Sequence, residues 1–182
     1  MSARERILDA AVKRIAREGI DDVRIARIAM DAGVSPSLVH YHFSSRDALL
    51  AEALEHSYER AGDVRIGEAE GNSARERLAA MVDQCLPAPG TLRDDFILWV
   101  ELWLRAARRP ELRETSARLY GRMHEWFRDV LAELAVADPG ATADRILALC
   151  DGYGIRVLCE DPAMPRERAL AAVTDALDQE LG

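Results

Sequence analysis

The chain lacks the features that mark metalloproteins, disulfide-rich secreted proteins and several classes of enzyme. Its three cysteines, Cys85, Cys150 and Cys159, lie far apart and form no Cys-x-x-Cys pair, which predicts reduced thiols buried in the core. The sequence has no metal-ligand spacing, no Gly-rich phosphate loop and no nucleophile elbow. We therefore expect neither a metal site nor a cofactor, and we predict that the chain is not an enzyme.

Long apolar runs are also missing. No uninterrupted apolar stretch approaches the ~20 residues that a membrane-spanning helix needs, and the N-terminal Ser-Ala-Arg-Glu-Arg is not followed by the apolar segment of a signal peptide. We therefore expect a cytoplasmic protein with no membrane partner. Strand-like alternation, repeats and low-complexity segments are absent too. Apolar residues instead recur at helical spacing, which predicts an all-α fold of about nine helices.

Positive charge is scarce and is carried almost entirely by arginine. The net charge is −8, and Lys13 is the single lysine. Residues 1–47 nevertheless hold eight basic and seven acidic side chains, against sixteen and twenty-five in the rest of the chain. Binding to nucleic acid needs only a local basic face. The N-terminal segment offers candidates for such a face: Arg4, Arg6, Arg24, Arg27 and Arg46.

The stretch from residue 29 to residue 43 predicts two helices joined by a tight turn. Gly33 is suited to the left-handed conformation that ends a helix. Ser35 can cap the next helix through its hydroxyl, and Pro36 fits the first helical position, where its missing N–H is not needed. This is the pattern of a helix-turn-helix, which lays its second helix in the major groove of DNA.

Residues flanking the turn resemble the signature of the tetracycline-repressor (TetR) family of bacterial transcription regulators. The chain departs from that signature at Val23-Arg24, where Thr is usual, and at His40, where Tyr is usual. The resemblance implies a helix-turn-helix DNA-binding domain over residues 1–47 and a ligand-binding and dimerisation domain over residues 48–182. The residues that carry it are Gly19, Ile28-Ala29, Gly33-Val34-Ser35-Pro36, Tyr41-His42-Phe43 and Arg46 with Leu49-Leu50.

The resemblance also implies which residues contact DNA. They lie on the two helices of the motif and at the start of the next helix, where arginines can meet phosphates and the second helix can meet base edges. The alternative for Tyr41 and His42 is packing within the domain, and for Arg46 a solvated surface position. The expected DNA-binding residues are Arg24, Arg27, Ser35, Ser37, Leu38, His40, Tyr41, His42 and Arg46.

Capping residues and helix breakers predict where helices begin and end. We expect Asp21 or Asp22 to cap the second helix, Ser44 to cap a fourth helix ending near residue 63, and Thr91 to cap a helix ending at the Arg108-Arg109-Pro110 break. Further helices are expected over residues 111–135, 142–159 and 165–181.

Aromatic residues make up only 5% of the chain, yet all three tryptophans and two of the three phenylalanines lie between Phe96 and Phe127. Their helical spacing fits either a hydrophobic core or the lining of a ligand pocket. Glu101 interrupts this apolar run, and a carboxylate beside indole rings suits an organic cation. The expected ligand-binding residues are Met81, Cys85, Phe96, Trp99, Glu101, Trp103, Tyr120, Met123, His124, Trp126 and Phe127.

The C-terminal half resembles one branch of the same family, the choline-responsive repressors of betaine synthesis. Asp151-Gly152 and Pro165-Arg166-Glu167-Arg168 carry this second resemblance. It implies a small-molecule effector that is an amine or a quaternary ammonium ion.

The last two predicted helices combine small residues with more apolar residues than one buried face needs. In the family such helices pack against their two-fold mates, which implies a homodimer. The expected interface residues are Leu147, Cys150, Tyr153, Leu158, Leu170, Val173 and Leu177.

Taken together, the sequence predicts a dimeric transcriptional repressor that binds a palindromic double-stranded DNA operator and is released by an effector. The alternative is a helical small-molecule-binding or scaffolding protein with no role on DNA, which the acidic composition favours and the intact turn disfavours.

Overall fold

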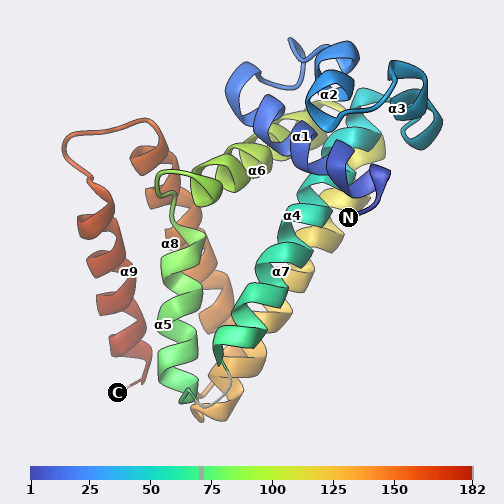
Figure 1. Cartoon of the computed structure of the whole chain (residues 1–182). Helices are drawn as coiled ribbons and strands as arrows, with labels where there is room; N and C mark the ends of the chain where they lie inside the picture. The colour runs from blue at the N-terminus through green and yellow to red at the C-terminus, as the bar shows by residue number, and fades with distance from the viewer. Residues whose placement is uncertain (70–71, 182) are drawn as a thin grey trace. The chain divides into compact units, whose positions relative to one another are not determined.

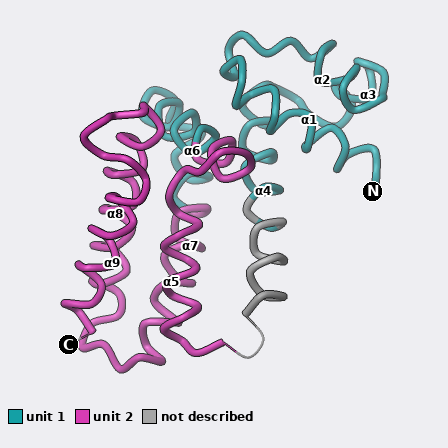
Figure 2. Tube along the Cα trace, turned by 60° about the vertical axis from the view of Figure 1, so that its left-hand side comes forward, with its two compact units in different colours: residues 1–66, 97–117 teal, residues 67–96, 118–182 magenta. Residues whose placement is uncertain are grey.

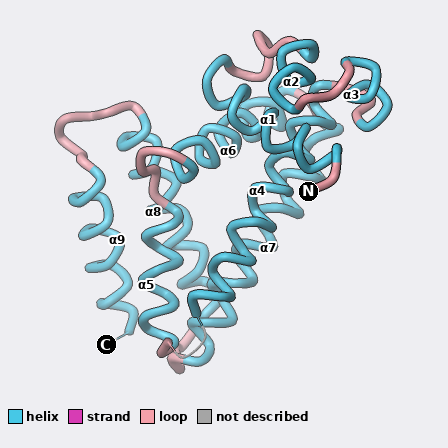
Figure 3. Tube along the Cα trace, viewed as in Figure 1, coloured by secondary structure: helices cyan, strands magenta, loops and turns pink. Residues whose placement is uncertain are grey.

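The computed structural model describes residues 1–69 and 72–181, and the side chains of all of these except residue 58 and residues 60–69. Within these ranges the chain forms nine α-helices and one short 3-10 helix, with no strand (Figure 1, Figure 3). The prediction of an all-α fold with about nine helices is confirmed. No helix in this described part of the chain is long and apolar enough to cross a membrane.

The helices are labelled in Figure 1 in chain order. Their bounds are α1 (Ala3–Glu18), α2 (Ile25–Ala32), α3 (Pro36–His42), α4 (Arg46–Ala69), α5 (Ala74–Cys85), α6 (Thr91–Arg108), the 3-10 helix η1 (Pro110–Leu112), α7 (Arg113–Glu133), α8 (Pro139–Leu158) and α9 (Arg166–Leu181).

The chain divides into two compact units, which Figure 2 distinguishes by colour. Unit 1 comprises residues 1–66 and 97–117, and unit 2 comprises residues 67–96 and 118–182. The boundary expected at residue 47 lies inside unit 1. A division of function between residues 1–47 and 48–182 therefore stays a prediction.

In unit 1, α1 packs against both α2 and α3. The helix begins at a capping box, in which the Ser2 hydroxyl accepts from the Glu5 backbone N–H and the Glu5 carboxylate accepts from the Ser2 N–H. It ends at Gly19, whose φ of 74° is costly for any residue with a side chain. The apolar side chains buried in these three helices include Ile7, Leu8, Ile15, Ile28 and Val39.

Three predicted helix caps are wrong. Arg24, not Asp21 or Asp22, is the N-cap of α2, and it makes no side-chain capping bond. At α4 the capping hydroxyl belongs to Ser45 rather than Ser44, because Ser45 Oγ accepts from the Ala48 N–H at 3.0 Å. Thr91 is itself the first residue of α6.

Two predicted helix bounds also move. The fourth helix, α4, continues to Ala69 instead of ending near residue 63. Helix α8 begins at Pro139 instead of residue 142, because Asp138 accepts from the Ala141 N–H and Pro139 occupies the first helical position.

The end of α6 holds together two segments of unit 1 that are distant in sequence. Arg105, of which only 8% is exposed, donates to an Asp47 oxygen on α4 at 2.5 Å and to the Asp21 carboxylate before α2. Arg109 pairs with the other Asp47 oxygen. Arg46 donates to the Asp21 backbone oxygen at 2.6 Å. This network fixes the segment that leads into α2 against the first turn of α4.

In unit 2, α8 packs against α5 and α9, and α5 also packs against α9. Arg145 of α8 makes a bidentate pair with Glu180 of α9, at 2.6 and 2.8 Å. Arg166 of α9 donates to the Asp83 backbone oxygen at 2.7 Å, near the end of α5. A small apolar core formed by Leu86, Met164 and Ala169 lies among these helices, with Tyr153, Val157 and Leu170 packed against it.

The three cysteines are free thiols, but they are not equally buried. Cys150 is buried and Cys85 half-buried, whereas Cys159 is exposed. The expectation of a buried core position is therefore wrong for Cys159. It follows the last turn of α8 as that helix's C-cap, a position at the end of a helix that does not face the core.

We predict that Arg105→Met lowers the stability of unit 1. Methionine retains the apolar stem but leaves the Asp47 carboxylate, 14% exposed, with Arg109 as its only ion-pair partner among the described residues. Breaking a buried pair is costly, and we expect a loss of about 1–3 kcal/mol in the free energy of unfolding. Urea denaturation of the whole chain measures it. Arg109→Met is the matched control, because the Arg109 side chain is 48% exposed and such pairs are worth below about 1 kcal/mol. Equal losses in the two variants would contradict the role assigned to Arg105.

Candidate functional site

The turn between α2 and α3 has the geometry predicted from its sequence. Gly33 adopts a left-handed conformation with φ 64° and ψ 41°. Ser35 Oγ accepts from the Leu38 N–H at 3.2 Å, and Pro36 is the first residue of α3. Val39 is buried, which fixes the side of α3 that faces the rest of unit 1.

The opposite side of α3 is open to solvent. Tyr41 is 82% exposed, so the alternative of packing within the domain does not hold for its ring. The His42 ring is half-buried and lies edge-on to Tyr41, with 5.2 Å between ring centroids. Of the nine expected DNA-binding residues, Leu38 and His42 are half-buried and seven are exposed: Arg24, Arg27, Ser35, Ser37, His40, Tyr41 and Arg46.

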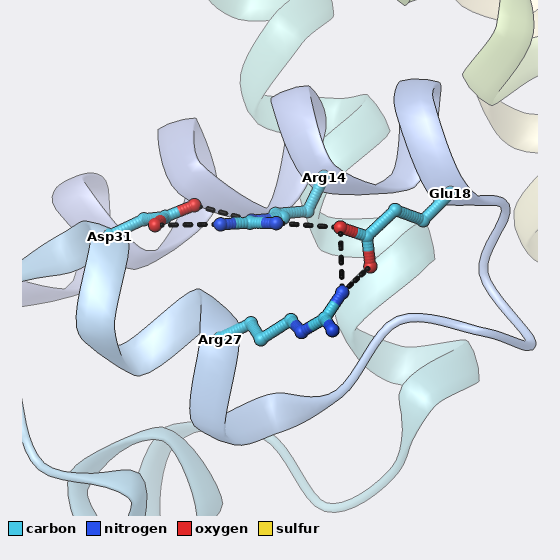
Figure 4. A network of polar contacts seen from close by, with 4 residues as sticks. All are labelled: Arg14, Glu18, Arg27 and Asp31. Atoms are coloured by element: carbon cyan, nitrogen blue, oxygen red, sulfur yellow. Dashed lines mark hydrogen bonds and ion pairs between the residues drawn. The ribbon is translucent and has the colours of Figure 1, made fainter.

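A network of charged side chains ties α1 to α2 beside this surface (Figure 4). Arg14 of α1 donates to the two carboxylate oxygens of Asp31 at 2.5 and 3.0 Å, and to Glu18 at 2.6 Å. These hydrogen bonds hold the pKa values of Asp31 and Glu18 below their ordinary ranges. Arg27 shares the Glu18 carboxylate through a single nitrogen, 3.3 Å from both oxygens. The remaining donors of the Arg27 guanidinium point away from this network, as Figure 4 shows.

The five arginines expected to form a basic face have different surroundings. Arg4 pairs with Glu52, Arg6 donates to the Ala32 backbone oxygen at 3.1 Å, and Arg27 and Arg46 have the partners described above. Arg24 is exposed at the N-cap of α2, and no partner is recorded for it within the described residues. Arg24 and Arg27 thus have guanidinium groups available to an anion, whereas Arg6 supports the fold.

Unit 2 contains a second group of polar side chains, in which Asp151, Tyr120 and Cys85 are half-buried and Cys150 is buried. The Tyr120 hydroxyl of α7 donates to the Asp151 carboxylate of α8 at 2.8 Å. The thiols of Cys85 and Cys150 lie beside this pair and contribute to the raised pKa of Tyr120, whose main cause is burial. Cys85 and burial likewise raise the pKa of Cys150. Burial also raises the pKa of Asp151, from 3.8 to about 6.

The expected ligand-binding residues are divided between the two compact units. Trp99, Glu101 and Trp103 belong to unit 1, and the other eight belong to unit 2. The two indole rings lie 5.7 Å apart, one helical turn from each other. Residues two apart on a helix do not share a face, and the Glu101 carboxylate lies beside Gly19 at the end of α1. The Glu101 carboxylate thus has a neighbour at the end of α1, and its part in ligand binding stays a prediction.

Among the eight expected ligand residues of unit 2, burial varies. Met81, Phe96, Met123 and Phe127 are buried, whereas Cys85, Tyr120, His124 and Trp126 are half-buried. The His124 ring lies 3.2 Å from both the Gly140 backbone oxygen and the Asp144 carboxylate. These contacts tie α7 to the start of α8, which gives His124 a structural role.

Asp151 is the residue that sequence reasoning missed as a site candidate. It was noticed only as part of the Asp151-Gly152 dipeptide that carries a family resemblance. The available signal is a carboxylate within the stretch from Ile146 to Ile155, whose other residues are apolar, aromatic or small. Its partner Tyr120 is 31 positions away, which the sequence alone does not reveal.

The residues expected at a dimer interface are largely occupied within the chain itself. Leu147, Cys150, Val173 and Leu177 are buried where α8 packs on the other helices of unit 2. Tyr153, Leu158 and Leu170 are half-buried. Ile155, 45% exposed on α8, is an additional apolar side chain open to a partner.

We predict that Asp151→Asn stabilises the protein above about pH 6. Asparagine retains an acceptor for the Tyr120 hydroxyl without burying a charge. In the wild type the folded state binds a proton up to about pH 6 and the unfolded state only to about pH 4, so stability falls as pH rises through this window. The variant lacks this fall and should gain about 1–3 kcal/mol above pH 6.

Urea denaturation at pH 4 and pH 7.5 tests this, with Asp175→Asn as the control because Asp175 is exposed on α9. A variant less stable than the wild type at pH 7.5, or one equally shifted at both pH values, would contradict the buried charge.

Comparison with known proteins finds a family match in each half of the chain. Residues 7–53 match the bacterial regulatory proteins of the tetR family, and residues 74–182 match the C-terminal domain of BetI-type transcriptional repressors. The HTH-type transcriptional regulator BetI of Brucella abortus is 29% identical over 177 residues, covering 94% of this chain and 88% of the relative.

Solved structures give the same result. A transcriptional regulator from Saccharomonospora viridis, crystallised in complex with choline, superposes with a TM-score of 0.85 at 33% identity, over 97% of this chain and 95% of that one. A TetR-family regulator from a Rhodococcus species has a TM-score of 0.85 at 32% identity over both entire chains. Since the BetI-type match alone covers more than half of the sequence, the protein belongs to the TetR family of bacterial transcriptional regulators, among its BetI-type repressors.

Proposed function

We propose that the protein is a homodimeric repressor in the cytoplasm that binds a palindromic DNA operator through α3 and is released by an organic ammonium effector of the choline class. The DNA-binding part of this proposal is supported by the exposed side of α3, which bears Tyr41. The turn before α3 contains the left-handed Gly33, and Ser35 caps the helix. Such a helix fits the major groove of DNA.

The exposed side chains on and near α3 provide the proposed contacts to DNA. Ser37, His40 and Tyr41 project from the exposed side of the helix and face base edges or the groove wall. Arg24 at the start of α2 and Arg46 at the start of α4 flank α3 in sequence and supply positive charge for phosphates. Arg46 is held in place by its bond to the Asp21 backbone oxygen, which orients the guanidinium before DNA arrives.

Two copies of the chain are needed to read a palindrome. A symmetric dimer presents two recognition helices roughly 34–36 Å apart, to successive major grooves on one side of the duplex. We assign the dimer contact to α8 and α9, where Ile155 is exposed and Leu158 half-buried.

The effector part of the proposal is supported by the choline-bound relative at 33% identity and by the BetI-type C-terminal match. Helix α6 begins at Thr91 and carries Arg105 in its last turn, and Arg109 follows the helix directly. Arg105 holds Asp21 and Asp47, and Arg109 also holds Asp47. A shift of α6 on effector binding would therefore move the supports of α3. A coupling of roughly 1–3 kcal/mol would change operator affinity about 5- to 150-fold.

We predict that the chain binds DNA from its own upstream intergenic region in preference to random duplex. Tyr41→Ala should weaken this binding about tenfold or more, and Arg24→Ala should lower the slope of log affinity against log salt by about 1, because one phosphate contact is lost. Fluorescence anisotropy across a salt series measures both effects. Arg128→Ala is the charge-matched control, since Arg128 is exposed on α7 and pairs with Asp129. Absence of any preference over random competitor would leave a helical ligand-binding protein with no role on DNA.

We also predict a dimer at micromolar concentration. Light scattering should give about twice the chain mass of 20.2 kDa, and Ile155→Glu should shift the mass toward the monomer, because it places a charge on the assigned contact surface. A monomeric wild type, or an unchanged dimer in this variant, would move the contact elsewhere or remove it.

A further inference from the structure

We propose that Asp151, together with the hydroxyl of Tyr120, is the site in unit 2 that binds the positively charged group of the effector. This inference rests on the proposed function, because it names the residues that recognise an ammonium ion. The recognising group is the carboxylate itself, since a quaternary ammonium ion has no N–H to donate and binds through charge and through aromatic faces.

The Asp151 carboxylate has no countercharge among the described residues. Other described carboxylates of unit 2 pair with arginines away from Asp151: Asp83 with Arg166, Asp129 with Arg128, Glu133 with Arg77, Asp161 with Arg156, Asp178 with Arg75 and Glu180 with Arg145. Asp151 is half-buried on α8, and in the described part of the chain no basic side chain pairs with it; its partner is the Tyr120 hydroxyl. A buried charge without a countercharge is costly. A cationic ligand supplies the missing charge.

Thiols and an aromatic ring lie near the Asp151 carboxylate. The Cys85 and Cys150 thiols lie beside the Tyr120–Asp151 pair, and sulfur is soft and apolar enough to pack against methyl groups. One turn along α8, Gly154 permits the Phe96 ring to approach the helix so closely that a Cβ at this position would overlap it. Residues three apart share a helix face, so an aromatic ring borders the stretch of α8 that carries Asp151. A negative charge among thiols and aromatic rings suits an alkylated ammonium ion.

Burial changes the pH range in which the Asp151 side chain is charged. Burial raises the pKa of Asp151 to about 6. The titratable groups facing it are the Tyr120 hydroxyl from α7 and, next to that hydroxyl, the Cys85 thiol from α5 and the Cys150 thiol from α8; α9 contributes none within the described residues. The pKa of Tyr120 and that of Cys150 are raised, so both remain neutral in this range. The carboxylate is charged above about pH 6 and neutral below it.

The test is titration calorimetry with choline on the full-length protein. We expect Asp151→Asn to weaken choline binding about thirtyfold or more, as loss of one partner of an enclosed charge pair does. Tyr120→Phe should weaken it less, and Asp175→Asn, the same chemical change at an exposed position of α9, should leave it unchanged. The uncharged isostere 3,3-dimethylbutan-1-ol should not bind the wild type. Affinity of the wild type should fall as pH drops through about 6, and Asp151→Asn should remove this dependence.

Several outcomes would overturn the assignment. If the wild type binds choline and Asp151→Asn binds it equally well, the site is elsewhere while the effector proposal stands. Loss of binding confined to Glu101→Gln would assign the cation to unit 1 instead. If the wild type binds DNA but neither choline nor another alkylammonium ion, the effector part of the proposed function fails together with this site. DNA binding by Asp151→Asn, whose substitution lies in unit 2, shows that the variant is folded.

Discussion

The position of the DNA-binding helices depends on one enclosed guanidinium. Arg105 links Asp21, before α2, to Asp47, in the first turn of α4, and the segment between these two residues carries the whole helix-turn-helix. The side chain of Asp21 is itself 84% exposed, so the link derives its strength from the buried side, where Arg105 and Asp47 exclude water. The supports of α3 are therefore set by a contact from α6 and not by the small apolar core of the first three helices alone.

Local features of the chain were predictable because their causes are local. A left-handed glycine, a capping serine and a helix-initiating proline act within five residues, so Gly33, Ser35 and Pro36 identified the turn correctly. A local rule also predicts Asp21 as a cap for α2, because an aspartate just before a helix commonly caps it. Its carboxylate is used instead by an arginine 84 positions away, and a capping rule cannot anticipate a competing partner at that distance. Arg24 then occupies the N-cap without making a capping bond.

The ligand site shows a different limit of sequence reasoning. The spacing of the aromatic residues correctly marked α6 and α7 as helices with apolar faces. It also suggested that Glu101 lies among indole rings, but neighbours in sequence at a spacing of two point to different sides of a helix. The carboxylate that does meet an aromatic hydroxyl, Asp151, comes from a helix in which every adjacent signal is apolar or small. The contacts that distinguish the two carboxylates are tertiary, and a pattern along one helix does not contain them.

The charges of Arg105 and Asp151 thus have different partners and, in our proposal, different functions. Arg105 is paired with two carboxylates of its own chain, so its charge is balanced without a ligand and it serves to hold the helices of the helix-turn-helix. Asp151 has a hydroxyl partner but, among the described side chains, no cationic one, so a cationic ligand would balance its charge in our proposal. Folding alone would favour an amide at this position. Such a residue gives a cationic effector affinity for the folded protein, and the effector shifts an equilibrium between two conformations only by as much as this affinity differs between them.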